Sequence, residues 1–186
     1  MKIGVVSDTH GDLKGWRAAQ EVFKGADYIV HAGDILYHGP FNPILTTYNP
    51  LKLAKDLNRS PIPIIFAKGN CDSDVDTLAL EYPIENPYAF IFVEGLRIMV
   101  NHGDRLESKS LADLAKKYLI DILIIGHTHI YQVERSDDII ILNPGSPSIP
   151  KGAGIPTVAV IKIEESKRNI EIVNIEAKKG VQSIEF

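Results

Sequence analysis

The sequence is poor in several features, and each scarcity excludes a class of protein. Its single cysteine, Cys71, cannot form an intramolecular disulfide, which favours a reducing compartment, and we expect the cytoplasm. Its apolar runs are too short for a membrane span, and the run that follows Met1 and Lys2 is unlike a signal peptide. Lys and Arg form no cluster and the net charge is -4, so we expect no extended nucleic-acid surface and no membrane partner.

Three well-known catalytic and nucleotide-binding patterns are also missing. The chain has no Gly-x-x-x-x-Gly-Lys-Ser/Thr phosphate loop and no Gly-x-Gly-x-x-Gly after a predicted strand. It has no Gly-x-Ser-x-Gly nucleophile elbow either. These absences exclude the common nucleotide-binding folds and the serine hydrolases of the α/β class.

What is present suits one globular domain over residues 1–186, because 45% hydrophobic residues can form a core without disulfides. The first third alternates strands and helices, which predicts a parallel sheet. The later part is mostly strand, with more strands than one sheet holds comfortably. We therefore predict a mixed α/β fold, a four-layer αββα sandwich of two mixed β-sheets flanked by helices. Predicted strands are at 2–7, 27–31, 62–67, 89–93, 97–100, 122–125, 131–134, 139–142, 157–164 and 170–175, and predicted helices are at 12–24, 51–57 and 111–118.

Five of the apolar runs end in side chains that can bind a metal ion. Ligands in open α/β sheets bind beyond the carboxyl ends of strands, and residues two apart in an extended segment point the same way. A glycine stands beside most of these side chains, as a tight backbone at a site requires. The candidate metal ligands are Asp8, His10, Asp34, Asn70, His102, His127 and His129.

These oxygen and nitrogen donors suit borderline divalent ions better than Ca or Mg. We expect manganese, with Ni, Co, Fe or Zn as alternatives. Seven ligands are too many for one ion, so we predict two ions, with Asp34 in its Gly-Asp turn as the bridging carboxylate.

Each candidate alone has an ordinary structural interpretation. An Asp or Asn after a strand is usually a turn former or a helix cap, and a lone His is usually a satisfied polar residue. The joint pattern is what favours a site. We expect His31, inside a predicted strand, to be a packed core residue. His38 lies in a loop, from which it could reach the cavity mouth. The turn from Asn143 to Ser146 is expected to support the site rather than to bind substrate.

The order of Asp-x-His, Gly-Asp, Gly-Asn, His-Gly and Gly-His-x-His, over residues 3–146, resembles the calcineurin-like metallophosphoesterase superfamily. Gly-Asn-Cys-Asp at 69–72 and Asn-Pro-Gly-Ser at 143–146 resemble its small bacterial and archaeal phosphodiesterase branch. The resemblance implies a four-layer αββα fold. It also implies a first metal held by Asp8, His10, Asp34 and His129 and a second held by Asp34, Asn70, His102 and His127.

The resemblance also implies a binuclear phosphoesterase in which a metal-bridging hydroxide attacks phosphorus, with Asp34, Asn70 and His102 as catalytic residues. Two divalent ions with the carboxylates Asp8 and Asp34 leave a local charge of about +2, which can activate water and hold a phosphate oxygen. Many relatives have a histidine where this chain has Cys71. We interpret Cys71 as a small, partly buried residue, although a thiol can donate a proton.

Without a strong acid at this position, we expect a phosphodiesterase acting on a small phosphate ester. The alternatives are a phosphomonoesterase and a non-catalytic metal-binding scaffold of the same fold, such as the retromer subunit of this superfamily. All ligand positions are filled, which favours an enzyme. Substrate contacts are expected from loops 36–48, 72–80 and 105–109, and because relatives often self-associate we expect a homodimer.

Overall fold

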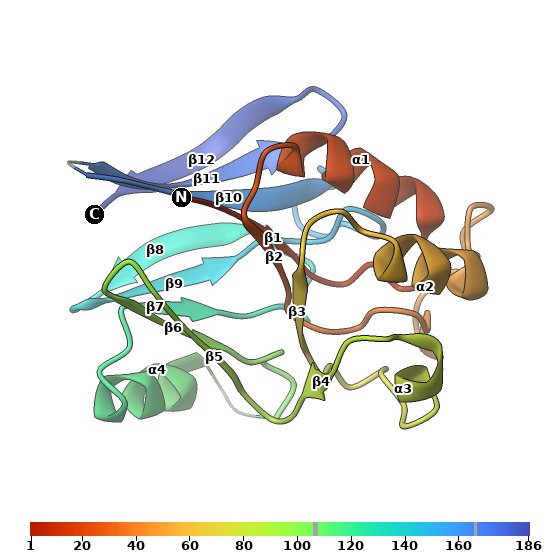
Figure 1. The fold of residues 1–186 in the computed structure, drawn as a ribbon, viewed down its shortest axis with the longest axis horizontal. Helices are drawn as coiled ribbons and strands as arrows, with labels where there is room; N and C mark the ends of the chain where they lie inside the picture. The colour runs from red at the N-terminus through yellow and green to blue at the C-terminus, as the bar shows by residue number, and fades with distance from the viewer. Residues whose placement is uncertain (106–107, 166) are drawn as a thin grey trace.

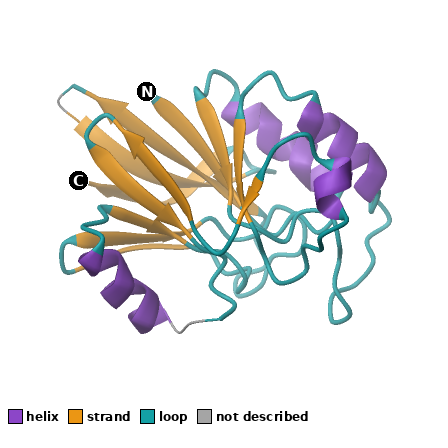
Figure 2. Ribbon diagram, turned by 60° about the horizontal axis from the view of Figure 1, so that its bottom comes forward, coloured by secondary structure: helices purple, strands orange, loops and turns teal. Residues whose placement is uncertain are grey.

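The computed structural model describes residues 1–105, 108–165 and 167–186 of the chain. Two β-sheets pack face to face, and helices cover the two outer faces, as Figures 1 and 2 show. The predicted four-layer αββα sandwich is therefore confirmed. No helix within the described ranges is long and apolar enough to cross a membrane.

The larger sheet has seven strands in the order β12-β11-β10-β1-β2-β3-β4. The half from β1 to β4 is parallel, as the alternation of strands and helices predicts, and β10 to β12 continue the sheet with antiparallel pairing. Its strands are β1 (Lys2–Val6), β2 (Tyr28–His31), β3 (Ile64–Ala67), β4 (Ile84–Glu85), β10 (Thr157–Glu164), β11 (Lys167–Asn174) and β12 (Lys179–Glu185).

The smaller sheet has five strands in the order β5-β6-β7-β9-β8. Its three central strands are parallel and its two edge strands pair in antiparallel fashion. The strands are β5 (Ala89–Val93), β6 (Leu96–Val100), β7 (Ile122–Ile124), β8 (Gln132–Ser136) and β9 (Ile139–Asn143). Both sheets thus have parallel strands whose carboxyl ends can carry functional loops.

Helices α1 (Leu13–Phe23) and α2 (Pro50–Asn58) pack on the larger sheet, where Trp16 and Leu53 are fully buried. Asp12 is the N-cap of α1, and its carboxylate accepts hydrogen bonds from backbone N–H groups of the first turn. Helix α4 (Ser108–Lys117) covers the smaller sheet, at the lower left of Figure 1, and buries Leu111. The short helix α3 (Asp76–Ala79) lies in the loop before β4.

The main core lies between the sheets and consists of the inward side chains of both, mostly Val and Ile. Val5, Ile98 and Ile161 are among its fully buried members. Side chains at alternate strand positions enter this core, while their neighbours pack under the helices. The predicted helices and strands are all found, within a few residues at their ends.

Three elements were missed by the sequence interpretation: α3, β4 and β12. The first two are only four and two residues long. Strand β12 alternates half-buried and exposed residues, and its sequence, Lys-Gly-Val-Gln-Ser-Ile-Glu, has no apolar run. Pairing with β11, across a register shift at Ile172 and Val173, is what makes it a strand.

Candidate metal centre

The seven predicted ligands lie together at the carboxyl ends of parallel strands from both sheets. The larger sheet supplies Asp8 and His10 after β1, Asp34 after β2 and Asn70 after β3, and the smaller sheet supplies His102 after β6 and His127 and His129 after β7. Each residue is only a few positions beyond its strand. Packing of the two sheets therefore brings five loops into one cluster.

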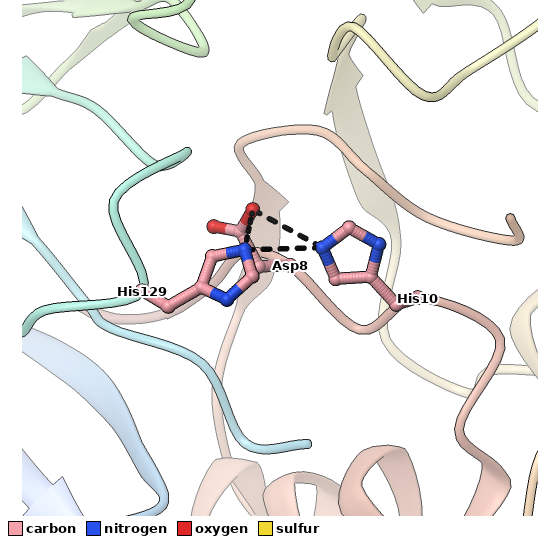
Figure 3. A group of neighbouring side chains, drawn as sticks. All are labelled: Asp8, His10 and His129. Carbon is pink, nitrogen blue, oxygen red and sulfur yellow. Dashed lines mark hydrogen bonds and ion pairs between the residues drawn. The ribbon is translucent and has the colours of Figure 1, made fainter. Parts of the chain in front are cut away.

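The innermost group consists of Asp8, His10 and His129, drawn in Figure 3. Asp8 Oδ1 lies 3.2 Å from His129 Nε2 and 3.6 Å from His10 Nε2. The two Nε2 atoms are 3.1 Å apart. All three side chains are buried, so this group is the deep end of the site.

Asp34 links this deep group to the rest of the cluster. Its Oδ2 atom lies 3.6 Å from His10 Nε2 and 3.3 Å from His102 Nε2. At the outer end, His127 Nδ1 is 2.8 Å from Asn70 Oδ1, and both of these residues are exposed. Asp34 is thus in contact with both halves of the cluster, the position that a bridging carboxylate requires.

Three histidine rings are oriented by backbone carbonyl groups. The Nδ1 atoms of His10, His102 and His129 lie 2.9, 2.8 and 3.0 Å from the carbonyl oxygens of Tyr37, Ala32 and Ile149. A carbonyl can only accept, so each Nδ1 carries a hydrogen and donates it. The Nε2 lone pair of each neutral ring then faces the cluster, which is the usual arrangement of metal-binding histidines.

Two buried atoms of the cluster have no hydrogen-bond partner within the described chain, Asp8 Oδ1 and His102 Nε2. A buried polar atom without a partner destabilises a fold by about 1–3 kcal/mol. Both atoms face other donor atoms of the cluster, at a distance of 3.9 Å from each other. These unpartnered atoms and the mixed carboxylate and imidazole donors fit divalent cations.

The electrostatics of the cluster also favour a cation. Burial raises the pKa of Asp8 and Asp34, but the neighbouring histidines outweigh it and hold both pKa values below the usual range. Burial lowers the pKa of His102, but the Asp34 carboxylate, whose Oδ2 lies 3.3 Å from Nε2, and the charge of Asp8 raise this pKa to about 9. The two carboxylates therefore bind positive charge tightly.

The backbone at the cluster is held in an unusual conformation. Positive φ angles occur at Asp8 (57°), His10 (45°), Asp34 (57°), His127 (67°) and His129 (58°). Residues with a side chain rarely adopt this left-handed region, and such strain gathers at functional sites. The surrounding contacts must therefore stabilise the loops.

Asp72, which the sequence interpretation placed only in a candidate substrate loop, is one of these stabilising residues. Its buried carboxylate accepts hydrogen bonds from the backbone N–H groups of Asp34 (2.8 Å), Ile35 (2.7 Å) and Gly69 (2.8 Å). Burial raises its pKa to about 6, so it is ionised at neutral pH. The signal that could have found it is its place in Gly-Asn-Cys-Asp, where an Asp can bond the backbone of its own turn.

Asn143 and Ser146 support the site, as the sequence predicts. The Asn143 amide donates to the carbonyl of Gly126 (2.9 Å) and to Thr128 Oγ1 (3.0 Å), within the loop that carries His127 and His129. The Ser146 hydroxyl donates to the Asp8 carbonyl (2.7 Å). The turn thus ties a ligand loop of one sheet to a ligand loop of the other.

His31 is a buried core residue, also as predicted. Its Nδ1 accepts from the N–H of Gly33 (3.2 Å), so its Nε2 carries the hydrogen and donates to Thr9 Oγ1 (2.9 Å). Burial lowers its pKa to about 3. His31 is therefore neutral and braces the loops that carry His10 and Asp34.

A cavity of about 490 Å³ opens beside the cluster. Asn70, His127 and His129 line it together with Tyr37 and Phe41. Loops 36–48 and 72–80, from which we expect substrate contacts, both contribute to its wall. In the third predicted loop, residues 106–107 lie outside the described residues.

His38 and Cys71 can now be placed. His38 does not line the cavity, because its ring packs between Tyr37 and Tyr48 at centroid distances of 4.6 and 5.2 Å. Cys71 does line it and is half-buried, and its N–H donates to Asp34 Oδ1 (2.8 Å). Burial and the neighbouring carboxylates raise the pKa of the thiol to about 12, so it is a very weak acid.

Comparison with known proteins gives consistent matches. Residues 1–166 match the family model of the calcineurin-like phosphoesterase superfamily domain. The chain is 39% identical over 154 residues to the phosphodiesterase YfcE of Escherichia coli (strain K12), with 82% of each chain covered. A solved structure of the E. coli phosphoesterase YfcE superposes with a TM-score of 0.86 at 30% identity, covering 99% of this chain and 98% of that one. Vacuolar Protein Sorting 29 of Cryptosporidium parvum, at 17% identity and a TM-score of 0.72, covers 100% of this chain and 97% of its own and shares the fold.

Proposed function

Because the chain belongs to the calcineurin-like phosphoesterase superfamily, and is thus a hydrolase of phosphate esters, we propose that it is a binuclear metal-dependent phosphodiesterase. The observation that carries this proposal is the convergence of Asp8, Asp34 and three inward Nε2 atoms in one buried cluster. The relative of 39% identity, YfcE, is itself named a phosphodiesterase.

We assign the first metal to Asp8, His10, Asp34 and His129 and the second to Asp34, Asn70, His102 and His127. Two sets of contacts support this division. The donor atoms of Asp8, His10 and His129 lie together, and Asp34 Oδ2 lies close both to His10 Nε2 of the first set (3.6 Å) and to His102 Nε2 of the second (3.3 Å). When bound, two divalent ions supply a water molecule of lowered pKa and hold the oxygens of the phosphate.

Neighbouring residues hold the proposed ligands in position. Asp34 would be the bridging ligand, because its Oδ2 contacts both His10 and His102. Cys71 N–H holds its side chain and the Asp72 carboxylate holds its backbone. Asn70 and His127 are the exposed ligands at the cavity, and Asp34 also lines it, so these three side chains can face the substrate. His102 is fixed by the Ala32 carbonyl, with its Nε2 toward Asp34. Asp34, Asn70 and His102 are the catalytic residues of this proposal.

A diester substrate is favoured over a monoester by the residue at position 71. A thiol stands where many relatives have an imidazole, so protonation of a poor leaving group lacks its usual donor. Esters with good leaving groups, and diesters, need that proton least. The alternatives are a phosphomonoesterase and a non-catalytic metal-binding scaffold.

A metal and substrate screen tests the proposal. Purified protein is assayed on bis(p-nitrophenyl) phosphate and p-nitrophenyl phosphate with Mn, Ni, Co, Zn or Mg, beside Asp34→Asn and Asp138→Asn. Asp138 is an exposed carboxylate in the turn between β8 and β9 and serves as the matched control. We expect the diester to be preferred, Asp34→Asn to be inactive and Asp138→Asn to be unaffected.

Each alternative has its own result in this screen. Faster hydrolysis of the monoester identifies a phosphomonoesterase. Absence of activity with every metal, together with no bound metal, identifies a scaffold. Full activity of Asp34→Asn refutes the binuclear mechanism.

The metal, the location and the oligomeric state complete the proposal. Manganese is the expected native ion, since the donor set accepts several borderline metals and availability decides among them. The free thiol of Cys71 supports a cytoplasmic location. We expect a homodimer. Metal analysis of protein purified without chelator, fractionation of the source cells and light scattering test these three points.

A further inference from the structure

The cavity beside the cluster has an apolar wall formed by the first part of loop 36–48. Phe41 borders this cavity with 97% of its side chain exposed, and Tyr37, beside the same cavity, is 44% exposed. A single exposed aromatic residue on a surface needs no explanation. Here, however, Tyr37, Phe41 and Pro40 line the same cavity as several of the proposed metal ligands.

Contacts with the ligand loops hold this wall in place. The carbonyl of Tyr37 accepts the Nδ1 hydrogen of His10, so the wall begins on a residue that orients a proposed ligand. Gly39 packs so tightly against Cys71 that an added Cβ would lie 2.9 Å from Sγ. The amide of Asn42 donates to the His38 carbonyl (2.8 Å) and closes the turn that carries Phe41. The backbone that carries Tyr37 and Phe41 is thus held relative to the cluster.

A cation completes the cavity. Lys151 lines it, and its backbone N–H donates to the carbonyl of His129 (3.0 Å). Within the described part of the chain its ammonium group forms no ion pair and no hydrogen bond. It is therefore available to an anion beside the cluster.

We propose that the substrate carries a flat aromatic substituent, an aryl ring or a nucleobase, that lies against Phe41 and Tyr37 while Lys151 pairs with a phosphate oxygen. This inference rests on the proposed function and adds a substrate class to it. An aromatic ring can stack on an aromatic side chain, which a methyl group cannot do. A cavity of about 490 Å³ suits a compact ligand of this kind.

Binding of two matched phosphonates tests the inference without any turnover. Isothermal titration of the Mn-loaded protein compares phenylphosphonate with methylphosphonate, which share the anionic group and differ in the ring. The wild type should bind phenylphosphonate about tenfold more tightly, and Phe41→Ala should bring this ratio close to one. Lys151→Gln should weaken both ligands equally.

Ile44→Ala is the matched control, because Ile44 is 66% exposed in the same loop and does not line the cavity. It should keep the wild-type ratio. An unchanged ratio in Phe41→Ala overturns the inference, even if the protein hydrolyses bis(p-nitrophenyl) phosphate as proposed. Conversely, an inactive wild type that shows the ring preference overturns the proposed function and leaves the aromatic site standing.

An assay with a cyclic nucleotide distinguishes a nucleobase from an aryl group as the natural occupant. If a nucleobase is the natural occupant, Phe41→Ala should raise the KM for adenosine 2′,3′-cyclic phosphate about tenfold with little change in kcat. If only the phenyl ligand responds to the substitution, the occupant is an aryl group.

Discussion

The Nε2 atoms of His10 and His129 face each other at 3.1 Å, although both rings donate their Nδ1 hydrogen to a backbone carbonyl. Each neutral ring then has only a lone pair at Nε2. Two lone pairs repel at this distance unless a proton or a cation lies near both. Asp8 Oδ1, which is 3.2 Å from His129 Nε2, adds negative charge at the same point. Protons and metal ions must therefore compete for the cluster.

This competition predicts that manganese binds more tightly as the pH rises. The pKa of His102 is raised to about 9, since its close contact with the Asp34 carboxylate and the charge of Asp8 outweigh burial. Below that pH a metal must displace a proton from His102, so affinity should rise by up to about tenfold per pH unit. Isothermal titration at several pH values, in buffers of different ionisation enthalpy, should show the release of about one proton. Binding that ignores pH would contradict the assignment.

The folding stability of the metal-free protein should instead fall as the pH rises. A pKa raised from 6.5 to about 9 in the folded state stabilises the protein fully below about pH 6.5, and this stabilisation is lost as the pH rises through about 9. Denaturant unfolding in chelator at both ends of this range should show a loss of stability in the wild type. His102→Gln should show a smaller loss, and equal losses would remove His102 as the cause.

Asp72 is predicted to control catalysis through the position of Asp34. Asp72→Asn keeps the size of the side chain but removes one of two oxygens that together accept three backbone hydrogen bonds. We expect a stability loss of about 1–3 kcal/mol and a fall in kcat of about 10- to 100-fold, with a smaller change in KM. Denaturant unfolding and steady-state kinetics measure the two effects.

Asp74→Asn is the control for this prediction, because Asp74 lies in the same loop with a fully exposed side chain paired to Lys68. A surface pair of this kind contributes little to stability. If both variants lose the same activity, the three backbone hydrogen bonds are not the reason.

Gly69 is predicted to tolerate no side chain. A Cβ at this position would lie 2.2 Å from Asp34 Oδ1 and 2.4 Å from the Asp34 backbone nitrogen, so Gly69→Ala must displace the proposed bridging carboxylate. We expect loss of one bound metal, seen by elemental analysis, and of most activity. Gly25→Ala is the control, since nothing lies within 4 Å of its added Cβ and only its positive φ (+74°) adds strain. It should lose about 1 kcal/mol of stability and keep both metals.

The placement of the proposed ligands after the strands could be predicted because it depends on local sequence. Apolar runs define the strands, and the polar residue and glycine after each run mark the loop. The partners that orient these residues could not be predicted in the same way. The carbonyls of Tyr37, Ala32 and Ile149 belong to residues whose types carry no signal, since any residue has a carbonyl.

The role of Asp72 and the strand β12 were missed because both depend on contacts between residues far apart in the sequence. Asp72 bonds to residues 37 and 38 positions away, so its role depends on the packing of β2 beside β3. Strand β12 likewise forms because β11 offers an edge. Its own sequence has no apolar run to indicate a strand.

Cys71 gives the sharpest test of the preference for diesters. If the thiol takes no part in proton transfer, Cys71→Ala should hydrolyse bis(p-nitrophenyl) phosphate within about twofold of the wild type. Cys71→His would place an imidazole beside the cavity, since this side chain already lines it. A general acid contributes about 10²- to 10⁴-fold, so this variant should gain activity toward alkyl phosphomonoesters and little toward aryl diesters, whose leaving groups need no proton. The ratio of the two kcat/KM values measures the change. A large loss of diesterase activity in Cys71→Ala would instead show that the thiol itself acts in the reaction, and the preference for diesters would then need another cause.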